Sequence, residues 1–148
     1  MANRRTRARQ FALQALYQWR ATAQDVAEIE AQFLEDEELA KAHVGLFVDL
    51  LRGVPEYLDE LDEKLDPLLS RPMSQVDPVE WAVLHIGAFE LMRHLDIPYR
   101  VVINEAVELV KIFGADDSHR FVNGVLDKLA QQLRATEVAV RRPGAGPG

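Results

Sequence analysis

The chain has 148 residues, 48% of them hydrophobic, and a net charge of −7, which fits a single domain with its own core. It contains no cysteine, which excludes disulfides and thiolate metal sites and fits a cytoplasmic protein. The N-terminus lacks the apolar run of a signal peptide, and no stretch approaches the ~20 apolar residues that span a bilayer, so we expect no membrane segment.

The charges are distributed unevenly along the chain. The first 20 residues carry five arginines and no acidic residue, whereas residues 21–70 carry 14 acidic residues and three basic ones. Because the chain as a whole would repel a polyanion, we expect any nucleic acid to bind at the basic N-terminal end. We interpret the acidic middle of the chain as a solvated surface.

Apolar residues recur at helical spacing from the N-terminus onward. The first predicted helix has an inward face made of Ala8, Phe11, Ala12, Ala15, Leu16 and Trp19. Its opposite face carries Arg7, Gln10, Gln14, Tyr17 and Gln18. Two further helices are predicted over 25–35, with Leu34 facing inward, and over 37–52, ending at Gly53. A fourth is expected to start near Pro55 and to end at the Asp66-Pro67 pair.

The segment Asp77-Pro78-Val79-Glu80 predicts the clearest helix start. Asp77 suits the cap, Pro78 suits the first helical position, and Glu80 completes a capping box. The helix that follows, over 78–95, is apolar nearly all round. A helix of this kind is expected to be central and buried.

The last two predicted helices cover 100–113 and 118–134, with Gly114 ending the first and Asp116, Asp117 or Ser118 capping the second. Asn123-Gly124 interrupts the second, and we interpret Gly124 as a point where a neighbouring helix packs closely. Residues 135–148 are expected to be a disordered tail. The sequence therefore predicts an all-α fold, with residues 1–134 forming one compact bundle of about seven helices.

Four arginines lie within six residues at the N-terminus: Arg4, Arg5, Arg7 and Arg9. Guanidinium groups bind phosphates through paired donors and stack on bases, so the cluster predicts nucleic-acid binding. Gln14 and Tyr17 extend it into a stripe of charge, amide donors and an aromatic ring, as in surfaces that bind single strands. The alternative is a basic terminus that only aids solubility.

The turn between the last two predicted helices, residues 113–121, is the second candidate binding site. A helix N-terminus presents free N–H groups that suit an anion. His119, Arg120 and two aromatic residues lie close to this helix start. The structural alternative is a capped turn whose phenylalanines, Phe113 and Phe121, belong to the core.

The sequence shows no catalytic or metal-binding pattern. Its four histidines lack a ligand spacing such as His-Glu-x-x-His, and no Gly-rich phosphate loop is present. Acidic pairs occur, but none neighbours a plausible nucleophile. We therefore expect no metal, no cofactor and no enzymatic activity.

Two long segments carry a family resemblance: RRTRARQFALQALYQW at 4–19 and NEAVELVKIFGADDSHRFVNGVLDKL at 104–129. They resemble the bacterial transcription antitermination factor NusB family. The predicted central helix and the connection Ile97-Pro98-Tyr99-Arg100 fit the same pattern, so the resemblance runs from residue 4 to about residue 134. The proline-enriched link from Leu69 to Asp77 and the extended C-terminal tail depart from the pattern.

The resemblance implies a helical bundle that binds the boxA element of single-stranded RNA together with NusE, a ribosomal protein of the small subunit. It implies that this complex joins elongating RNA polymerase, suppresses termination and supports ribosomal RNA transcription. The implied RNA contacts are the N-terminal arginines and a turn made of Asp117, Ser118, His119, Arg120 and Phe121. Glu80, at the start of the central helix, is implied to face NusE.

Two alternatives stay open at this point. Some members of the family self-associate, so a homodimer that covers the RNA surface is compatible with the resemblance. A different functional class is a helical protein–protein scaffold whose arginines only aid solubility. RNA affinity separates this scaffold from an RNA-binding adaptor, because only the adaptor binds single strands in a strongly salt-sensitive way.

Overall fold

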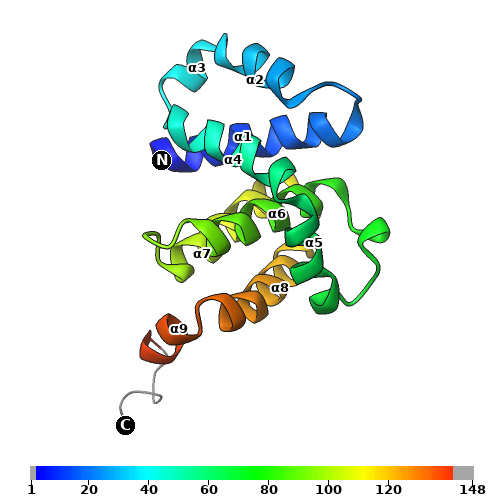
Figure 1. The fold of residues 1–148 in the computed structure, drawn as a ribbon, viewed down its shortest axis with the longest axis vertical. Helices are drawn as coiled ribbons and strands as arrows, with labels where there is room; N and C mark the ends of the chain where they lie inside the picture. Colours follow the sequence, from blue (N-terminus) through cyan, green and yellow to red (C-terminus); the bar gives the residue numbers. More distant parts are fainter. Residues whose placement is uncertain (1–2, 142–148) are drawn as a thin grey trace.

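The computed structural model describes residues 3–141, and within this range the chain forms helices and no strand (Figure 1). The α-helices are α1 (Arg4–Ala21), α2 (Val26–Leu34), α3 (Glu37–Ala40), α4 (Val44–Glu56), α5 (Leu58–Leu65), α6 (Pro78–Arg93), α7 (Tyr99–Phe113), α8 (Ser118–Leu133) and α9 (Ala135–Arg141). Two short 3-10 helices, Asp66–Leu68 and Met73–Gln75, lie between α5 and α6. None of the described helices is long and apolar enough to cross a membrane.

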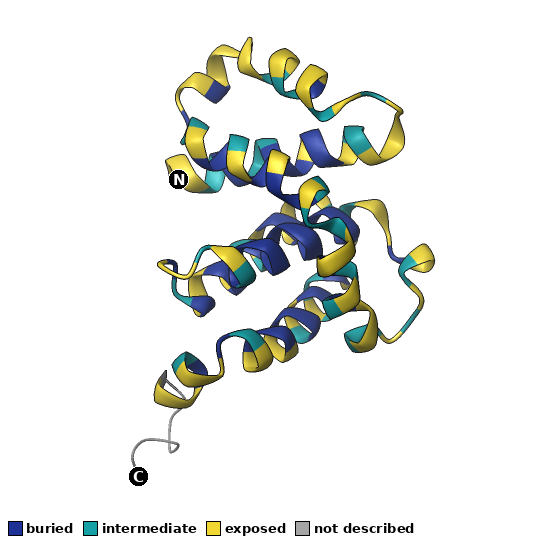
Figure 2. Cartoon of the chain, viewed as in Figure 1, coloured by how far each residue is buried: buried dark blue, intermediate teal, exposed yellow. Residues whose placement is uncertain are grey.

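The all-α prediction is confirmed, and α6 is the central helix. It packs against α1, α4, α5, α7 and α8. Every residue from Glu80 to Leu91 is buried, in agreement with its nearly continuous apolar sequence (Figure 2). The predicted capping box is present at its start, where Asp77 accepts from the backbone N–H of Glu80 and Glu80 accepts from that of Asp77.

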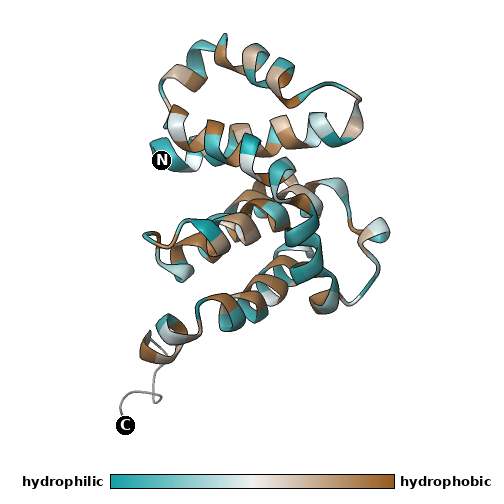
Figure 3. Ribbon diagram, in the orientation of Figure 1, coloured by the Kyte–Doolittle hydropathy of each residue, from teal (hydrophilic) through white to brown (hydrophobic). Residues whose placement is uncertain are grey.

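The other long helices are amphipathic and cover α6 with their apolar faces. Polar and apolar segments alternate along α4, α7 and α8 (Figure 3). In α1 the predicted inward face is confirmed: Ala8, Ala12, Ala15 and Leu16 are buried, and Phe11 and Trp19 pack against the core. The short helices α2 and α3 lie on the far side of α1 from α7 and α8 (Figure 1).

The structure has more helices than the expected seven, partly because the predicted helix over 37–52 is two helices. The first of these helices, α3, ends at Ala40, and α4 begins at Val44. The imidazole of His43 caps α4 by accepting from the backbone N–H of Leu46. The expected end at Gly53 is also wrong, since α4 continues through Pro55 to Glu56. A side chain at Gly53 would overlap the ring of Phe89, so packing between α4 and α6 accounts for this glycine.

Two further expectations about packing are wrong. Leu34, predicted to face inward, is 45% exposed at the end of α2. At Gly124, a Cβ atom would meet no heavy atom within 4 Å, so no neighbouring helix packs over this residue. Close helix approach occurs instead at Gly53 and at Gly87, where an added Cβ would lie 2.7 Å from Leu126.

Replacing Gly124 by alanine is expected to stabilise the protein by about 0.5–1 kcal/mol, because glycine loses more backbone entropy in a helix interior. The space around Gly124 accepts a methyl group without a clash. Urea unfolding measures the change. The matched control is Gly87→Ala in α6, which is expected to destabilise because Leu126 occupies the space. A less stable Gly124→Ala protein would contradict the prediction.

The expected disordered tail is also corrected in part. Residues 135–141 form α9, and Val138 is buried against the core. The backbone N–H of Tyr99, at the start of α7, donates to Glu137 at 2.7 Å. Capping of α7 and burial of Val138 therefore give this segment the tertiary contacts that a disordered tail lacks. The remainder of the predicted tail, residues 142–148, lies outside the described residues.

Candidate nucleic-acid interface

Three of the four clustered arginines lie in the first turn of α1 and are fully or partly exposed to solvent. Arg4 and Arg5 are exposed, and the side chain of Arg7 is 39% exposed. The side chain of Asn3 caps this turn by accepting from the backbone N–H of Thr6 at 2.7 Å. Arg7 makes only a surface ion pair with Glu38, at 3.2 Å, and such pairs contribute little stability. These guanidinium groups remain available to an anionic ligand.

Arg9 does not belong to this exposed cluster, and its prediction as an RNA contact is corrected. Its side chain is 2% exposed and forms two hydrogen bonds to the carboxylate of Glu90, at 2.9 and 2.7 Å. A third hydrogen bond, at 3.2 Å, reaches Glu105 on α7. Arg9 lies four residues before Leu13 and seven before Leu16, which are both buried, so helix periodicity places it on the inward side of α1. The structure therefore places Arg9 in the core.

The ionisation of this buried cluster follows from its contacts. Burial lowers the pKa of Arg9, but the hydrogen bond to Glu90 and the charges of Glu90 and Glu105 outweigh it, so the pKa is raised. Burial raises the pKa of Glu90, but hydrogen bonding to His94 and Arg9 outweighs it, so the pKa is lowered. Glu90, whose carboxylate lies 3.7 Å from the His94 ring, and Asp49 raise the pKa of His94. Arg9 and Glu90 therefore favour their charged forms and pair with each other.

The outward face of α1 continues from Arg7 to Gln14 and Tyr17. Gln14 is exposed and the Tyr17 side chain is 46% exposed, so both are accessible. At its far end this face meets the segment before α6. Tyr17 and Arg20 line a depression of about 310 Å³ with Ser74, Val76 and Pro78.

The α7–α8 turn contains residues with different accessibilities. Asp117 occupies the N-cap position of α8 but its side chain makes no capping hydrogen bond, and Ser118 is buried. Ring nitrogen Nδ1 of His119 lies 3.1 Å from the Asp116 carbonyl oxygen, whereas Arg120 is exposed. Ser118 is thus a packing residue at the helix start, and Arg120 is the accessible cation of the turn.

Phe121 links this turn to the segment before α6. Its ring is half-buried beneath the guanidinium group of Arg71, which lies 4.1 Å from the ring centroid. Because Val76 and Pro78 of that segment border Tyr17, residues 71–78 connect the outer face of α1 with the start of α8. The two predicted binding regions are therefore joined by one connecting segment, although they are far apart in sequence.

Glu80 is not an exposed partner contact, and this prediction is also corrected. The residue is 4% exposed, and its carboxylate pairs with Arg71 at 2.7 Å while it completes the capping box. The capping function thus turns the carboxylate back toward the chain. Its neighbour Arg71, with 39% of its side chain exposed, is the accessible group at this place.

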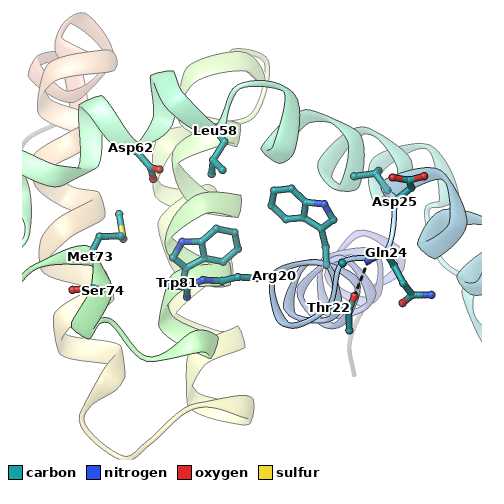
Figure 4. Close-up of a pocket in the computed structure, with 12 residues that line it drawn as sticks. Arg20, Thr22, Gln24, Asp25, Leu58, Asp62, Met73, Ser74 and Trp81 are labelled. Atoms are coloured by element: carbon teal, nitrogen blue, oxygen red, sulfur yellow. Dashed lines mark hydrogen bonds between the residues drawn. The ribbon is translucent and has the colours of Figure 1, made fainter.

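A groove that the sequence analysis missed lies at the end of α1. It has a volume of about 720 Å³ and is lined by residues of α1, α2 and α5, by Met73 and Ser74 before α6, and by Trp81 of α6 (Figure 4). Arg20 reaches from α1 to Trp81 on α6, with its guanidinium carbon 4.6 Å from the ring centroid. Trp19 and Trp81 are the two tryptophans of the chain, and their ring centroids are 6.4 Å apart. No local sequence pattern predicts this groove, because Trp19 and Trp81 are far apart in the sequence and come together only in the fold.

A comparison with family models decides the relationship, because the model described as the NusB family matches residues 6–131. The chain belongs to the NusB family. The transcription antitermination protein NusB of Nitrosococcus oceani is 55% identical over 141 residues, covering 95% of each chain. That of Alcanivorax borkumensis is 54% identical over 139 residues, covering 94% of this chain and 93% of the relative.

A solved structure gives the same result at the level of the fold. The structure of T. maritima NusB is similar with a TM-score of 0.74 and 31% identity, covering 89% of this chain and 94% of that one. By homology, the chain is a transcription antitermination protein, and members of the NusB family are transcription factors and not enzymes. Within the described residues, no group of three or more His, Cys, Asp or Glu side chains is arranged to hold a metal ion.

Proposed function

We propose that this protein binds boxA-type single-stranded RNA together with NusE and so modifies elongating RNA polymerase in the cytoplasm to support ribosomal RNA transcription. The observation that carries the proposal is the accessible start and outer face of α1: Arg4, Arg5 and Arg7 are accessible in its first turn, and Gln14 and Tyr17 lie farther along the outer face that begins at Arg7. Cations that bind phosphates beside an aromatic ring that stacks on bases suit a single strand.

The turn before α8 is the second part of the proposed RNA surface. Arg120 supplies an exposed cation and His119 lies beside it, at a helix start where backbone N–H groups favour an anion. Asp117 is exposed at the same place, so its charge opposes the approach of a phosphate. We leave Arg9, Ser118 and Glu80 out of the proposed contacts because they are buried.

The dependence of RNA affinity on salt tests the proposal. Three phosphate contacts by Arg4, Arg5 and Arg7 predict a slope of log K against log salt of about −2 for a single strand. Changing these three residues together to alanine is expected to remove this contribution and to leave only the slope due to the turn at Arg120. A boxA-like oligonucleotide, with and without NusE, is titrated by fluorescence anisotropy at several salt concentrations.

The matched control removes the same charge elsewhere: Lys64, Arg93 and Lys128, on α5, α6 and α8, are changed to alanine. This variant is expected to keep a slope near that of the wild type. Light scattering of the same samples reports a homodimer that would compete with RNA for α1. A wild-type protein that binds the oligonucleotide no better than an unrelated acidic protein would favour a protein–protein scaffold instead.

A further inference from the structure

The first two turns of α1 are attached to the rest of the protein by a polar network that is buried at Arg9 and Glu90 and partly buried at Thr6 and Glu105. Oxygen Oε1 of Glu105, on α7, accepts from the hydroxyl of Thr6 at 2.7 Å and from Nη1 of Arg9 at 3.2 Å. Arg9 also binds Glu90 on α6 through two hydrogen bonds. Thr6 and Arg9 are three residues apart and therefore lie on one face of the helix. Arg4 and Arg7 extend from the other side of this turn, whereas Arg5, four residues before Arg9, borders a depression with His43 and His94.

A network of this kind specifies geometry more than it adds stability. Burying two charges costs several kcal/mol per ion, so a buried ion pair is often no more stable than apolar residues of similar volume. The hydrogen bonds, however, fix the rotation and the position of α1 relative to α6 and α7. A slip or rotation of the helix would break the two hydrogen bonds to Glu90 and leave this buried carboxylate without its guanidinium partner.

We propose that Thr6, Arg9 and Glu105 are positioning residues that hold the first turn of α1 in the orientation in which Arg4, Arg5 and Arg7 bind phosphate. This inference rests on the proposed RNA binding and identifies the residues that organise that surface. Thr6 lies between Arg5 and Arg7 in sequence, so an ordered Thr6 fixes the backbone from which both arginines extend.

The first turn needs such an attachment because helix ends fray. Besides this network, the described contacts of the turn with other elements include the hydrogen bonds of Arg4 to Ala42 and of His43 to Arg4, at 3.3 and 3.1 Å. A frayed turn must become ordered when RNA binds. The conformational entropy that is lost in this step lowers the affinity. The apparent dissociation constant rises in inverse proportion to the fraction of molecules in the competent state.

The most direct test is Thr6→Val, which removes the hydroxyl that binds Glu105 and keeps the size and net charge of the side chain. If the competent fraction falls to between about a third and a tenth, RNA affinity falls about three- to tenfold. The salt slope is expected to stay unchanged, because no phosphate contact is lost. Thr6→Ser retains the hydroxyl and is expected to restore wild-type affinity. Hydrogen exchange is expected to be faster in the first turn of α1.

A second variant separates position from charge. Glu105→Ala removes an acidic group near the arginines, which by itself would tighten RNA binding, whereas lost positioning weakens it. Arg9 keeps its two hydrogen bonds to Glu90 in this variant, so the fold is expected to persist. The matched control is Glu30→Gln, which breaks the ion pair of Glu30 with Arg52 between α2 and α4 and is expected to leave RNA affinity unchanged.

The outcomes distinguish the inference from the function on which it rests. Weaker binding by Thr6→Val and Glu105→Ala, with an unchanged slope and with rescue by Thr6→Ser, supports the positioning role. Wild-type affinity in both variants, measured with a wild-type protein that binds RNA, overturns the positioning role and leaves the proposed function standing. A wild-type protein that does not bind the oligonucleotide overturns both.

Discussion

Replacing Arg9 by methionine is expected to destabilise the protein by about 3–5 kcal/mol, because it leaves a buried carboxylate without its partner. Glu90 is 1% exposed, and Arg9 is the guanidinium group that neutralises it through two hydrogen bonds. A loss of this size is a large fraction of the 5–15 kcal/mol that typically stabilises a domain. Urea unfolding of the variant and of the wild type measures it.

Two control proteins identify the cause of that loss. Arg7→Ala removes an arginine from the same helix, but this arginine makes only a surface ion pair, so a change of no more than about 1 kcal/mol is expected. The double variant Arg9→Met/Glu90→Met removes both charges and is expected to be more stable than Arg9→Met alone. An Arg9→Met protein within 1 kcal/mol of the wild type would show that Glu90 finds another way to be neutralised.

Replacing Arg134 by alanine is expected to cost at least about 3 kcal/mol, because several buried carbonyl groups lose a charged donor at once. This residue follows α8 and is 6% exposed. Its guanidinium group donates to the carbonyl oxygens of Glu90, Leu91, His94 and Ile97 at 2.9–3.3 Å, and to the carboxylate of Glu137 at 2.7 Å. Arg134 thus satisfies the C-terminal end of α6 and the connection to α7.

The variant Arg134→Lys tests how much the planar arrangement of the arginine donors contributes to stability. Lysine keeps the charge but has three donors on one nitrogen, which cannot replace the planar fork of arginine, so an intermediate loss is expected. The matched control is Lys128→Ala, an exposed position on α8, where a change within about 0.5 kcal/mol is expected. Thermal unfolding of the three variants ranks them. Equal stability of Arg134→Ala and Lys128→Ala would assign Arg134 no capping role.

The sequence predicted those elements whose signals are local. The capping box at Asp77 and Glu80, the stop at Gly114 and the apolar faces of α1 and α6 depend on residues within one or two turns of each other, and the structure has each of them. The break between α3 and α4 was missed because the apolar period continues across it. The helix at 135–141 was missed because the contacts of Glu137 and Val138 are made with distant residues.

Local sequence patterns also do not predict which charged side chains are buried. Four arginines within six residues cannot be told apart by composition, yet three are accessible to solvent and Arg9 is buried. The difference depends on Glu90 and Glu105, which lie 81 and 96 residues away along the chain. The resemblance implied that Glu80 faces NusE, whereas its carboxylate is buried by pairing with Arg71 across a loop.

By itself, the sequence determined the all-α class, the central position of α6 and the basic start of α1, because helix periodicity, capping and charge clustering act over a few residues. The tertiary structure alone decided which arginines are free, which glycines are tightly packed and how α9 is held. These properties depend on pairs such as Arg9 with Glu90 and Gly53 with Phe89, whose members approach each other only after the helices have packed.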